Sequence, residues 1–451
     1  MTSLGYPAQR MLTNRGPRAP WSRPRAALAG LLVAAMGIAA LPGIGTAAVA
    51  PAATPPVERW TRQFGTTEYE DVFTIAVDGL GRSYVAGATG GSLGGATKGG
   101  EDAFLRSYTR SGQLRWTRQF GSRADDRAMG DAVDGDGFIV VVGDTSGKLP
   151  GPKKGGQDAW VRKYRPDGSL LWARQFGTLQ DDEARAVAID GAGNIFVAGE
   201  TGGALAGTPK GQTDAFLRKY SPSGSVRWTR QFGTPTADYV DGAAADSSGN
   251  AWVIGGTDGD LAGVNAGGFD AVVRKYDASG HHRWTRQFGT TEGDFAEDAD
   301  ADGSGNLIVV GSTDGAMPGG GSDPGASDVF VRKLSPSGAD VWTRQFGSDA
   351  EDYPNRVDVD GHGNAYIGGG TNGELPGQTQ VGGPDAFVVS YGSGGGLRWT
   401  LQFGTVAEDS VKGVAVQHVD EVYLSGSTDG ELATPPKGSG DAFVRRYVPP
   451  G

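Results

Sequence analysis

Seven acidic residues recur at a fixed distance from seven tryptophans, and no other residues of this chain suggest chemistry by their number and spacing as strongly. The tryptophans stand in variants of the string "RWTRQFG" and are Trp60, Trp116, Trp172, Trp228, Trp284, Trp342 and Trp399. The acid ten residues after each of them is, in order, Glu70, Asp126, Asp182, Asp238, Asp294, Asp352 and Asp409. Carboxylates that converge would attract a cation or a basic partner, so these seven are the candidate binding residues. The alternative is that each carboxylate accepts backbone N–H bonds in its own loop and only shapes that loop.

The rest of the chain offers little for catalysis or metal binding. It has no cysteine, and its histidines fall in turns between predicted strands, at His281, His282, His362 and His418. No Ser–His–Asp set or isolated carboxylate pair stands out among the many repeated acids, so we predict no catalytic residue. The string "DADADGSGN" from Asp298 to Asn306 is similar to a calcium loop, but Val309 stands where that loop needs a glutamate. An alternating strand and a turn explain the string, and we predict neither a metal ion nor a cofactor.

The acids belong to a repeat that must position them. The tryptophans are 56 to 58 residues apart, and each interval holds four short segments, such as "ARAVAID", "IFVAGET", "DAFLRKY" and the next Trp string. Each segment is alternating or β-branched and is bounded by Gly, Asn, Asp or Pro, which is typical of strands. Tight turns such as "GAGN" and "SPSG" join them into antiparallel meanders. Seven such four-stranded units predict an all-β, seven-bladed β-propeller.

The two ends of the repeat are complementary. The pattern opens with a Trp strand at Arg59 and ends with "DAFVRRY" at Asp441–Tyr447, so the last unit lacks its own Trp strand. We predict that the N-terminal strand pairs with the C-terminal blade and closes the ring. The propeller then occupies residues 59–448.

The recurring strings W-T-R-Q-F-G, V-A-x-D-x-x-G-N-x-x-V-x-G-x-T and D-A-F-V-R-K-Y resemble the bacterial SBBP family of seven-bladed β-propeller repeats over about residues 57–448. A fainter similarity links "AVAIDGAGNIFVAG" to NHL-type blades. The resemblance implies the fold and often an exported setting, and it supplies no catalytic residues. It also implies that the "AVAID" segment is innermost and the Trp segment outermost. The acidic crossovers and the Gly-rich loops then share one face, which is the candidate binding face because loops commonly carry function.

The two outer strands of a unit suggest a ladder of side chains. If Gly112 closes a three-residue turn, Arg106 lies opposite Trp116, and Asp102 lies diagonal to Arg118. Cation–π contacts and ion pairs along this ladder would pack blade against blade. One unit has Val389 and Leu401 in place of both arginines, and a shared location on one face would explain why the two losses fall in one hairpin.

The N-terminus and the charge indicate an exported protein. Residues 1–50 carry arginines ahead of an apolar run from Ala26 to Leu41 and end in small residues, which resembles a secretory signal peptide; an uncleaved anchor is the alternative. Residues 51–58 are a short linker. The formal net charge is −11, and loss of the arginine-rich signal makes the chain more acidic. Nucleic acid and anionic membranes are therefore poor partners, and no membrane span is expected after cleavage.

These observations predict a secreted or cell-envelope, monomeric, non-enzymatic propeller. Its loop-rich face would bind a protein or a small ligand, a cationic one if the seven acids form the site, or would serve as a scaffold. Fold alone does not decide function, so two alternatives stay open. One is a propeller lyase or hydrolase. The other is a glycan-binding module, which the scarcity of aromatic residues in the Gly-rich loops disfavours.

Overall fold

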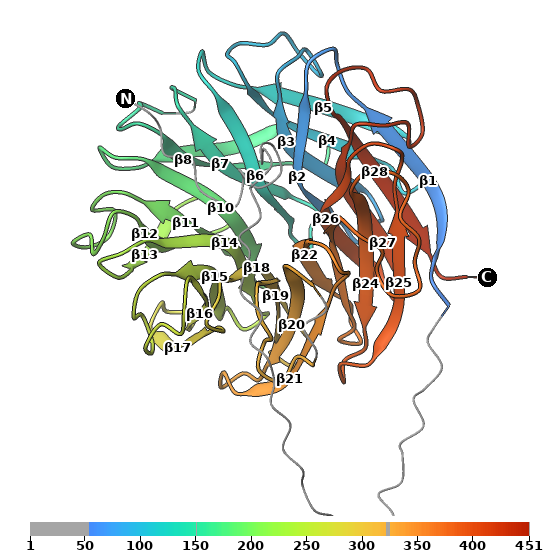
Figure 1. Cartoon of the computed structure of the whole chain (residues 1–451). Coiled ribbons are helices and arrows are strands. Elements are labelled where there is room, and N and C mark those ends of the chain that lie inside the picture. The colour runs from blue at the N-terminus through green and yellow to red at the C-terminus, as the bar shows by residue number, and fades with distance from the viewer. Residues whose placement is uncertain (1–53, 150, 322–324, 451) are drawn as a thin grey trace, which may run out of the picture. The chain divides into compact units, whose positions relative to one another are not determined.

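The propeller is a ring of seven four-stranded antiparallel sheets (Figure 1). The computed structural model describes residues 54–149, 151–321 and 325–450, so the predicted signal peptide, residues 1–50, lies outside the described residues. These residues fold as one unit within Pro51–Gly451. They contain no helix long and apolar enough to span a membrane. The predicted all-β propeller of seven blades with four strands each is confirmed.

The strands of each blade follow one another from the ring axis outward. Blade 1 consists of β2 (Glu70–Val77), β3 (Ser83–Thr89), β4 (Asp102–Tyr108) and β5 (Leu114–Phe120). Blade 2 consists of β6 (Asp126–Val133), β7 (Ile139–Thr145), β8 (Asp158–Tyr164) and β9 (Leu170–Phe176). Blade 3 consists of β10 (Asp182–Ile189), β11 (Ile195–Thr201), β12 (Asp214–Tyr220) and β13 (Val226–Phe232). Blade 4 consists of β14 (Asp238–Ala245), β15 (Ala251–Thr257), β16 (Asp270–Tyr276) and β17 (His282–Phe288).

The remaining blades repeat this order, and the last one takes its outermost strand from the other end of the chain. Blade 5 consists of β18 (Asp294–Ala301), β19 (Leu307–Thr313), β20 (Asp328–Leu334) and β21 (Asp340–Phe346). Blade 6 consists of β22 (Asp352–Val359), β23 (Ala365–Thr371), β24 (Asp385–Tyr391) and β25 (Leu397–Phe403). Blade 7 consists of β26 (Asp409–His418), β27 (Glu421–Thr428), β28 (Asp441–Val448) and β1 (Val57–Phe64).

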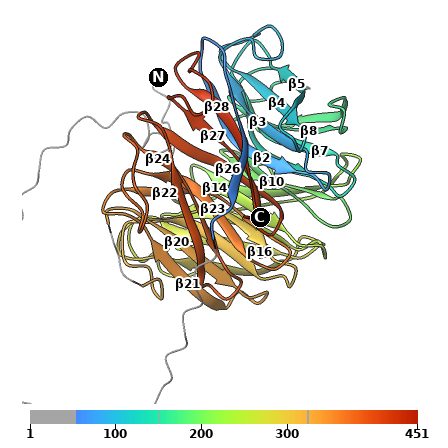
Figure 2. The ribbon, with the colours of Figure 1, turned by 90° about the vertical axis from the view of Figure 1, so that its right-hand side faces the viewer.

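The predicted closure of the ring is confirmed. Strand β1 pairs antiparallel with β28, from Val57 opposite Val448 to Phe64 opposite Ala442. Figure 2 shows the first strand of the chain lying beside the last ones. The pairing removes the two sheet edges that an open ring would expose.

The hydrophobic core is divided into layers between neighbouring blades. The layer between blades 2 and 3, for example, joins Val142 and Phe176 to Ile195 and Phe216. The second strand of a blade is buried on both sides, as the fully buried run of β11 shows. A strand covered on both faces needs apolar residues at successive positions, which explains segments such as "IFVAG". Neighbouring blades therefore hold each other in place.

The predicted ladder is wrong in register and in direction. The turn at Gly112 is as predicted, with Tyr108 opposite Leu114, but a β-bulge follows, so Arg106 pairs with Thr117 and not with Trp116. Arg106 consequently faces the preceding blade, where its guanidinium lies 4.3 Å from the ring centroid of Phe64.

Trp116 and Arg118 face the following blade and dock on its outer turn. Arg118 Nε donates to the carbonyl of Gly168 at 2.8 Å, and Trp116 Nε1 donates to the carbonyl of Pro166 at 3.2 Å. Gly168 has φ +80°, and a Cβ there would stand 2.8 Å from the Trp116 ring. Only glycine therefore suits this turn. The partners expected for Asp102 also differ, since it accepts a hydrogen bond from Gln119 at 3.0 Å.

This docking contact explains why one unit has Leu401 in place of the docking arginine. Leu401 stands on blade 6 and faces blade 7, whose outer strands are the two chain ends and share no turn. No turn carbonyl is present there for an arginine to reach. Trp399 donates instead to Asp420 Oδ1 at 3.0 Å, and Arg398 pairs with the same carboxylate at 2.8 Å. The predicted shared location of Val389 and Leu401 is wrong, because they pair with Thr400 and Val388.

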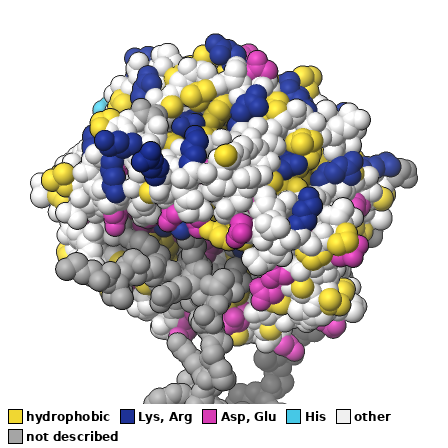
Figure 3. Space-filling model, turned by 90° about the horizontal axis from the view of Figure 1, so that it is seen from above, with side chains coloured by type: hydrophobic (Ala, Val, Ile, Leu, Met, Phe, Trp, Pro, Cys, Tyr) yellow, Lys and Arg dark blue, Asp and Glu magenta, His cyan; other side chains and the backbone are white. Residues whose placement is uncertain are grey.

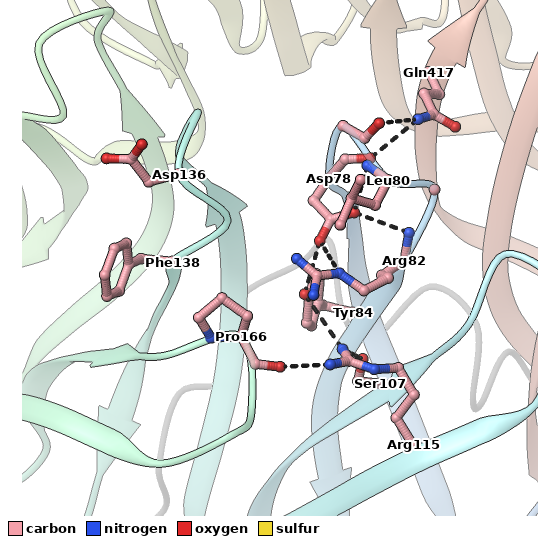
Figure 4. Close-up of polar contacts among 12 residues, drawn as sticks. Asp78, Leu80, Arg82, Tyr84, Ser107, Arg115, Asp136, Phe138, Pro166 and Gln417 are labelled. Atoms are coloured by element: carbon pink, nitrogen blue, oxygen red, sulfur yellow. Dashed lines mark hydrogen bonds and ion pairs between the residues drawn. The ribbon is translucent and has the colours of Figure 1, made fainter.

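On the face of the hairpin turns, polar contacts bridge the blades near the closure. Figure 4 shows Gln417 of blade 7 donating to backbone carbonyls of blade 1, with a distance of 2.9 Å to Gly79 O. Asp78 of the same turn pairs with Arg82. Arg115 donates to the carbonyl of Pro166 in blade 2 at 2.9 Å. This face is built from turns that hold one another.

We expect the docking arginines to stabilise the ring only where a turn receives them. Arg344 Nε donates to Gly395 O at 2.7 Å, so Arg344→Leu should lower the free energy of unfolding by about 0.5–1.5 kcal/mol. Leu401→Arg, the reverse change at the closure, should bring no gain. Denaturant unfolding of both variants measures this. A stabilising Leu401→Arg would contradict the proposed reason for the leucine.

Candidate binding site at the channel mouth

The seven repeated acids open the innermost strands and are buried, with exposed fractions between 0% and 2%. Asp182 is representative. Its Oδ2 accepts bonds from the backbone N–H and the hydroxyl of Thr178, the latter at 2.9 Å, and its Oδ1 accepts the hydroxyl of Thr201. Burial raises the pKa of these groups at Asp126, Asp182, Asp238, Asp294, Asp352 and Asp409. Each carboxylate thus holds its own crossover to the end of its own second strand, and ligand binding by the seven stays a prediction.

The residues that follow these acids differ from blade to blade. At the first position after the acid stand Asp71, Arg127, Glu183, Tyr239, Phe295, Tyr353 and Ser410. Two positions later, at a β-bulge common to the innermost strands, stand Phe73, Met129, Arg185, Asp241, Glu297, Asn355 and Lys412. Bulges often re-aim side chains beside functional sites. Polar and aromatic residues are therefore concentrated where the repeat is least regular.

Charged residues of the innermost strands influence one another's pKa. Burial raises the pKa of Asp131 in blade 2, and Arg356 of blade 6 opposes that rise. Burial lowers the pKa of Lys412 in blade 7, and Glu297 of blade 5 is among the carboxylates that oppose that fall. Since blades 6 and 2, and blades 5 and 7, are not neighbours in the ring, these side chains act on one another across the channel. The innermost strands gather around this axis in Figure 1.

The charged part of the channel mouth spans blades 1 to 3. Arg185 lies 2.7 Å from Glu183 and 3.9 Å from Glu200, and Glu200 also accepts the backbone N–H of Val240 in the next blade at 3.1 Å. Arg127 pairs with Glu101 at 2.5 Å. Arg185 is thus paired within blade 3, whereas Arg127 of blade 2 is paired with Glu101 in the Gly-rich loop of blade 1. A ligand therefore meets a surface with fixed charges of both signs.

The aromatic part spans blades 4 and 5. The rings of Tyr239, Phe269 and Phe295 pack together with centroid distances of 5.3, 5.5 and 6.0 Å, and all three side chains remain partly exposed. Tyr239 and Phe295 belong to innermost strands, and Phe269 ends a Gly-rich loop. This cluster was not predicted from the sequence, because a single Gly-rich loop contributes only Phe269 and the other two rings come from two different strands. The signal lay in the residue after each repeated acid.

Burial in the channel shifts several carboxyl groups toward neutrality. It raises the pKa of Asp131 and of Glu200 to about 7, and that of Glu297 to about 8. Removing charged groups from water disfavours their ionised form, and cations such as Arg356 and Arg185 offset only part of this effect. The channel is thus a place where protonation changes near neutral pH.

The "DADAD" string contributes to contacts between blades. Asp298 and Asp300 accept the backbone N–H groups of Val357 and Val359 in blade 6 at 3.1 and 3.0 Å. Asp302 closes its own turn and pairs with Lys333 at 2.9 Å. The three carboxylates are thus engaged with separate partners. Among residues 54–149, 151–321 and 325–450, no group of three His, Cys, Asp or Glu side chains is placed to hold a metal ion.

Four segments of the chain, residues 59–94, 171–205, 227–262 and 341–376, match the family model of the SBBP beta-propeller repeat. The match places SBBP repeats at these four positions of the chain. The regulatory protein FlaEY of Caulobacter vibrioides is similar to the chain, with 27% identity over 418 residues that cover 80% of this chain. The match covers 41% of FlaEY, so the chain spans less than half the length of that relative.

Two solved structures are similar in fold at low identity. The WD40 domain of Neurospora crassa Pan2 has 13% identity and a TM-score of 0.49, over 89% of this chain and 98% of that one. YCF48 bound to D1 peptide has 12% identity and a TM-score of 0.48, over 88% and 97%. At these values the likeness supports no argument about what the propeller binds.

The buried carboxylates predict a folding role that can be measured. Asp182→Ala leaves the Thr178 N–H and the Thr201 hydroxyl without their acceptor, and each orphaned donor should destabilise the propeller by about 1–3 kcal/mol. Urea unfolding of the variant measures the loss. Gln180→Ala, an exposed position in the same crossover, is the control and should be neutral. An Asp182→Ala protein as stable as the control would contradict the prediction.

The channel also predicts a pH dependence of stability. An aspartate in the unfolded chain releases its proton near pH 3.9, whereas Asp131 in the folded protein holds it up to about pH 7. Between these values the folded state binds more protons, so the free energy of unfolding should fall as pH rises from about 4 to 7. A carboxyl group whose pKa is lowered in the folded protein, such as that of Glu421, changes the free energy of unfolding at more acidic pH.

Unfolding of the wild type and of Asp131→Asn across this pH range tests the claim. The asparagine can still accept the hydroxyl of Thr74, which lies 2.7 Å from the Asp131 carboxylate. It cannot titrate, so its stability should depend less on pH. Identical pH profiles for the two proteins would contradict a raised pKa at this position.

Proposed function

We propose that this protein is an exported, non-enzymatic binding module whose channel mouth on the loop-rich face receives a segment of a partner protein. The observation that carries the proposal is the aromatic cluster Tyr239, Phe269 and Phe295 beside a mouth rich in carboxylates. A partly exposed aromatic ring is stabilised when a partner covers it and removes it from water, and aromatic residues are enriched in protein interfaces.

The charges of the mouth favour a basic partner segment. Carboxylates outnumber cations there, and Arg127 and Arg185 are already paired with Glu101 and Glu183. Asp241 and Glu297 form no ion pair within 4.0 Å among the described residues, and they stand on the same two innermost strands as Tyr239 and Phe295. Burial raises the pKa of both carboxyl groups, and a cation bound beside them would favour their ionised form. A partner that presents an aromatic or aliphatic side chain next to a lysine or arginine satisfies both the ring cluster and the carboxylates.

The setting of this function is part of the proposal. The N-terminal segment that resembles a secretory signal, residues 1–50, supports export. The similarity to a protein called regulatory supports a role in binding another protein, since a propeller without catalytic residues acts through its partners. The rigid ring presents its mouth at a fixed geometry, which reduces the entropy lost on binding.

A displayed library of random peptides, panned on the full-length protein, tests the proposal. We expect enriched sequences in which an aromatic or aliphatic residue adjoins Lys or Arg. Phe295→Ala and Glu297→Gln should each weaken the binding of an enriched peptide by about tenfold, as loss of a central interface residue commonly does. Calorimetric titration of each variant gives the ratio.

Leu179→Ala is the matched control, because this side chain is 83% exposed in a crossover of the same face but lies outside the aromatic cluster. It should bind the peptide like the wild type. Enriched peptides that ignore Phe295 and Glu297, or a library without any enriched sequence, would overturn the channel mouth as the binding site.

A further inference from the structure

One cavity of the loop-rich face differs from the channel mouth in place and in charge. It has a volume of about 570 Å³ and lies where the crossover between blades 1 and 2 passes between their Gly-rich loops. Its lining comprises Lys98, Gly121, Ser122, Arg123, Ala124, Gly147 and Lys148. All three charged side chains of this lining are cations. The volume falls within the range usual for small-ligand pockets.

The three cations are free to bind a ligand. Lys98, Arg123 and Lys148 are exposed, and within the described part of the chain none of them forms an ion pair shorter than 4.0 Å. The adjacent carboxylate of Asp125 is held by the Gly-rich loop of blade 1, because it accepts the backbone N–H of Glu101 at 3.2 Å. These unpaired cations share one lining although the chain has a net charge of −11, and Lys and Arg are also plentiful on the side of the ring seen in Figure 3.

Comparison of the seven units shows that the folding of the repeat does not require these charges. The positions equivalent to Arg123 hold Thr67, Leu179, Pro235, Thr291, Asp349 and Val406. Those equivalent to Lys148 hold Ser92, Ala204, Asp260, Ala316, Glu374 and Glu431. No other unit has a cation at either position. The backbone of the crossover and loops recurs in the other units, so the fold does not require the charges of Arg123 and Lys148. Lys98 is different, because it recurs as Lys154, Lys210 and Lys437.

We infer that this cavity, which we call the blade 1–2 pocket, binds a tetrahedral oxyanion ester, a phosphate or sulfate group carried on a small molecule or a sugar. Lys98, Arg123 and Lys148 supply charge-assisted donors from three separate loop segments that converge on one volume. Arginine offers two parallel N–H donors to such a group, and each lysine adds a point charge. A monocarboxylate offers two acceptor oxygens where either ester offers three, and would use fewer of these donors.

The pocket is distinct from the proposed peptide site, which is built on blades 4 and 5, so either can fail without the other. Its ligand binds by charge and should be displaced as ionic strength rises. Gly121 and Gly147 line the cavity, and their lack of a side chain lets Asp102 and Ser122 approach the backbone closely.

Calorimetric titration of the full-length protein at low ionic strength tests the inference with inorganic phosphate, inorganic sulfate, glucose 6-phosphate and glucose 6-sulfate as probes. We expect one site per chain. Phosphate and sulfate probes that bind equally indicate recognition of the oxyanion alone, whereas a preference identifies which ester is the ligand. The double variant Arg123→Thr with Lys148→Ala should weaken binding by about tenfold or more.

Both replacements already occur at equivalent positions, Thr67 and Ala204, so the double variant is expected to fold, and its melting temperature verifies this. Lys154→Ala is the matched control, because Lys154 is the counterpart of Lys98 in the next unit and should not affect the titration. Equal weakening by Lys154→Ala would mean general attraction and would overturn the pocket.

A transfer of the charges to the next interface gives a second, independent readout. Leu179→Arg with Ala204→Lys reproduces the arginine and lysine beside Lys154, so the stoichiometry should rise from one site to two. Binding that stays at one site in this variant, wild-type affinity in the Arg123→Thr, Lys148→Ala protein, or a wild type that binds none of the four probes would each overturn the inference.

Discussion

The ring depends on a contact in which six of the seven outer strands dock on the outer turn of the next blade. An indole lies against a glycine that no other residue could replace, and its N–H reaches a turn carbonyl, as Trp172 does with Pro222 O at 3.1 Å. At Arg62, Arg118, Arg230 and Arg344 the arginine Nε also reaches the glycine carbonyl, at 2.7 Å for Arg230. The contact fixes the angle between neighbouring sheets, and seven such angles must close a circle. A chain without disulfides therefore obtains its rigidity from repetition of one geometry.

The closure shows how specific that geometry is. Blade 7 has two chain ends where other blades have a turn, and the residues facing it change together. Arg398 and Trp399 both turn to Asp420, which has φ +56° in the β26–β27 turn, and an arginine is replaced by Leu401. Glu421 adds a second bridge, pairing with Arg110 of blade 1 at 2.6 Å. The exceptions to the repeat thus follow from the one place where the repeat cannot be satisfied.

The features that recur in every unit could be predicted from the sequence, because a pattern that occurs seven times marks a requirement of the fold. Blade number, strand order and closure all follow from the spacing of Trp60 and its counterparts. The register of the outer hairpin did not, since a single bulged residue at Arg115 reverses the face of Arg118 and no local pattern marks it. The channel mouth could not be predicted either. Tyr239 and Phe295 are 56 residues apart, and only the curvature of the ring brings their rings within 6.0 Å.

Internal repetition also separates structural from functional positions without any related sequence. Asp182 and its counterparts are the same in nearly every unit, and each is buried against its own crossover. Both properties indicate that these residues are needed for folding. The next residue is an acid, a base or an aromatic depending on the blade, and that position surrounds the channel mouth. Arg123 follows the same logic on the rim, since six other units fold with Thr, Leu, Pro, Asp or Val in its place. In a propeller of near-identical blades, a binding site at one place must be built from residues that differ from the repeat. Seven identical surfaces would bind a ligand with the same affinity at each blade.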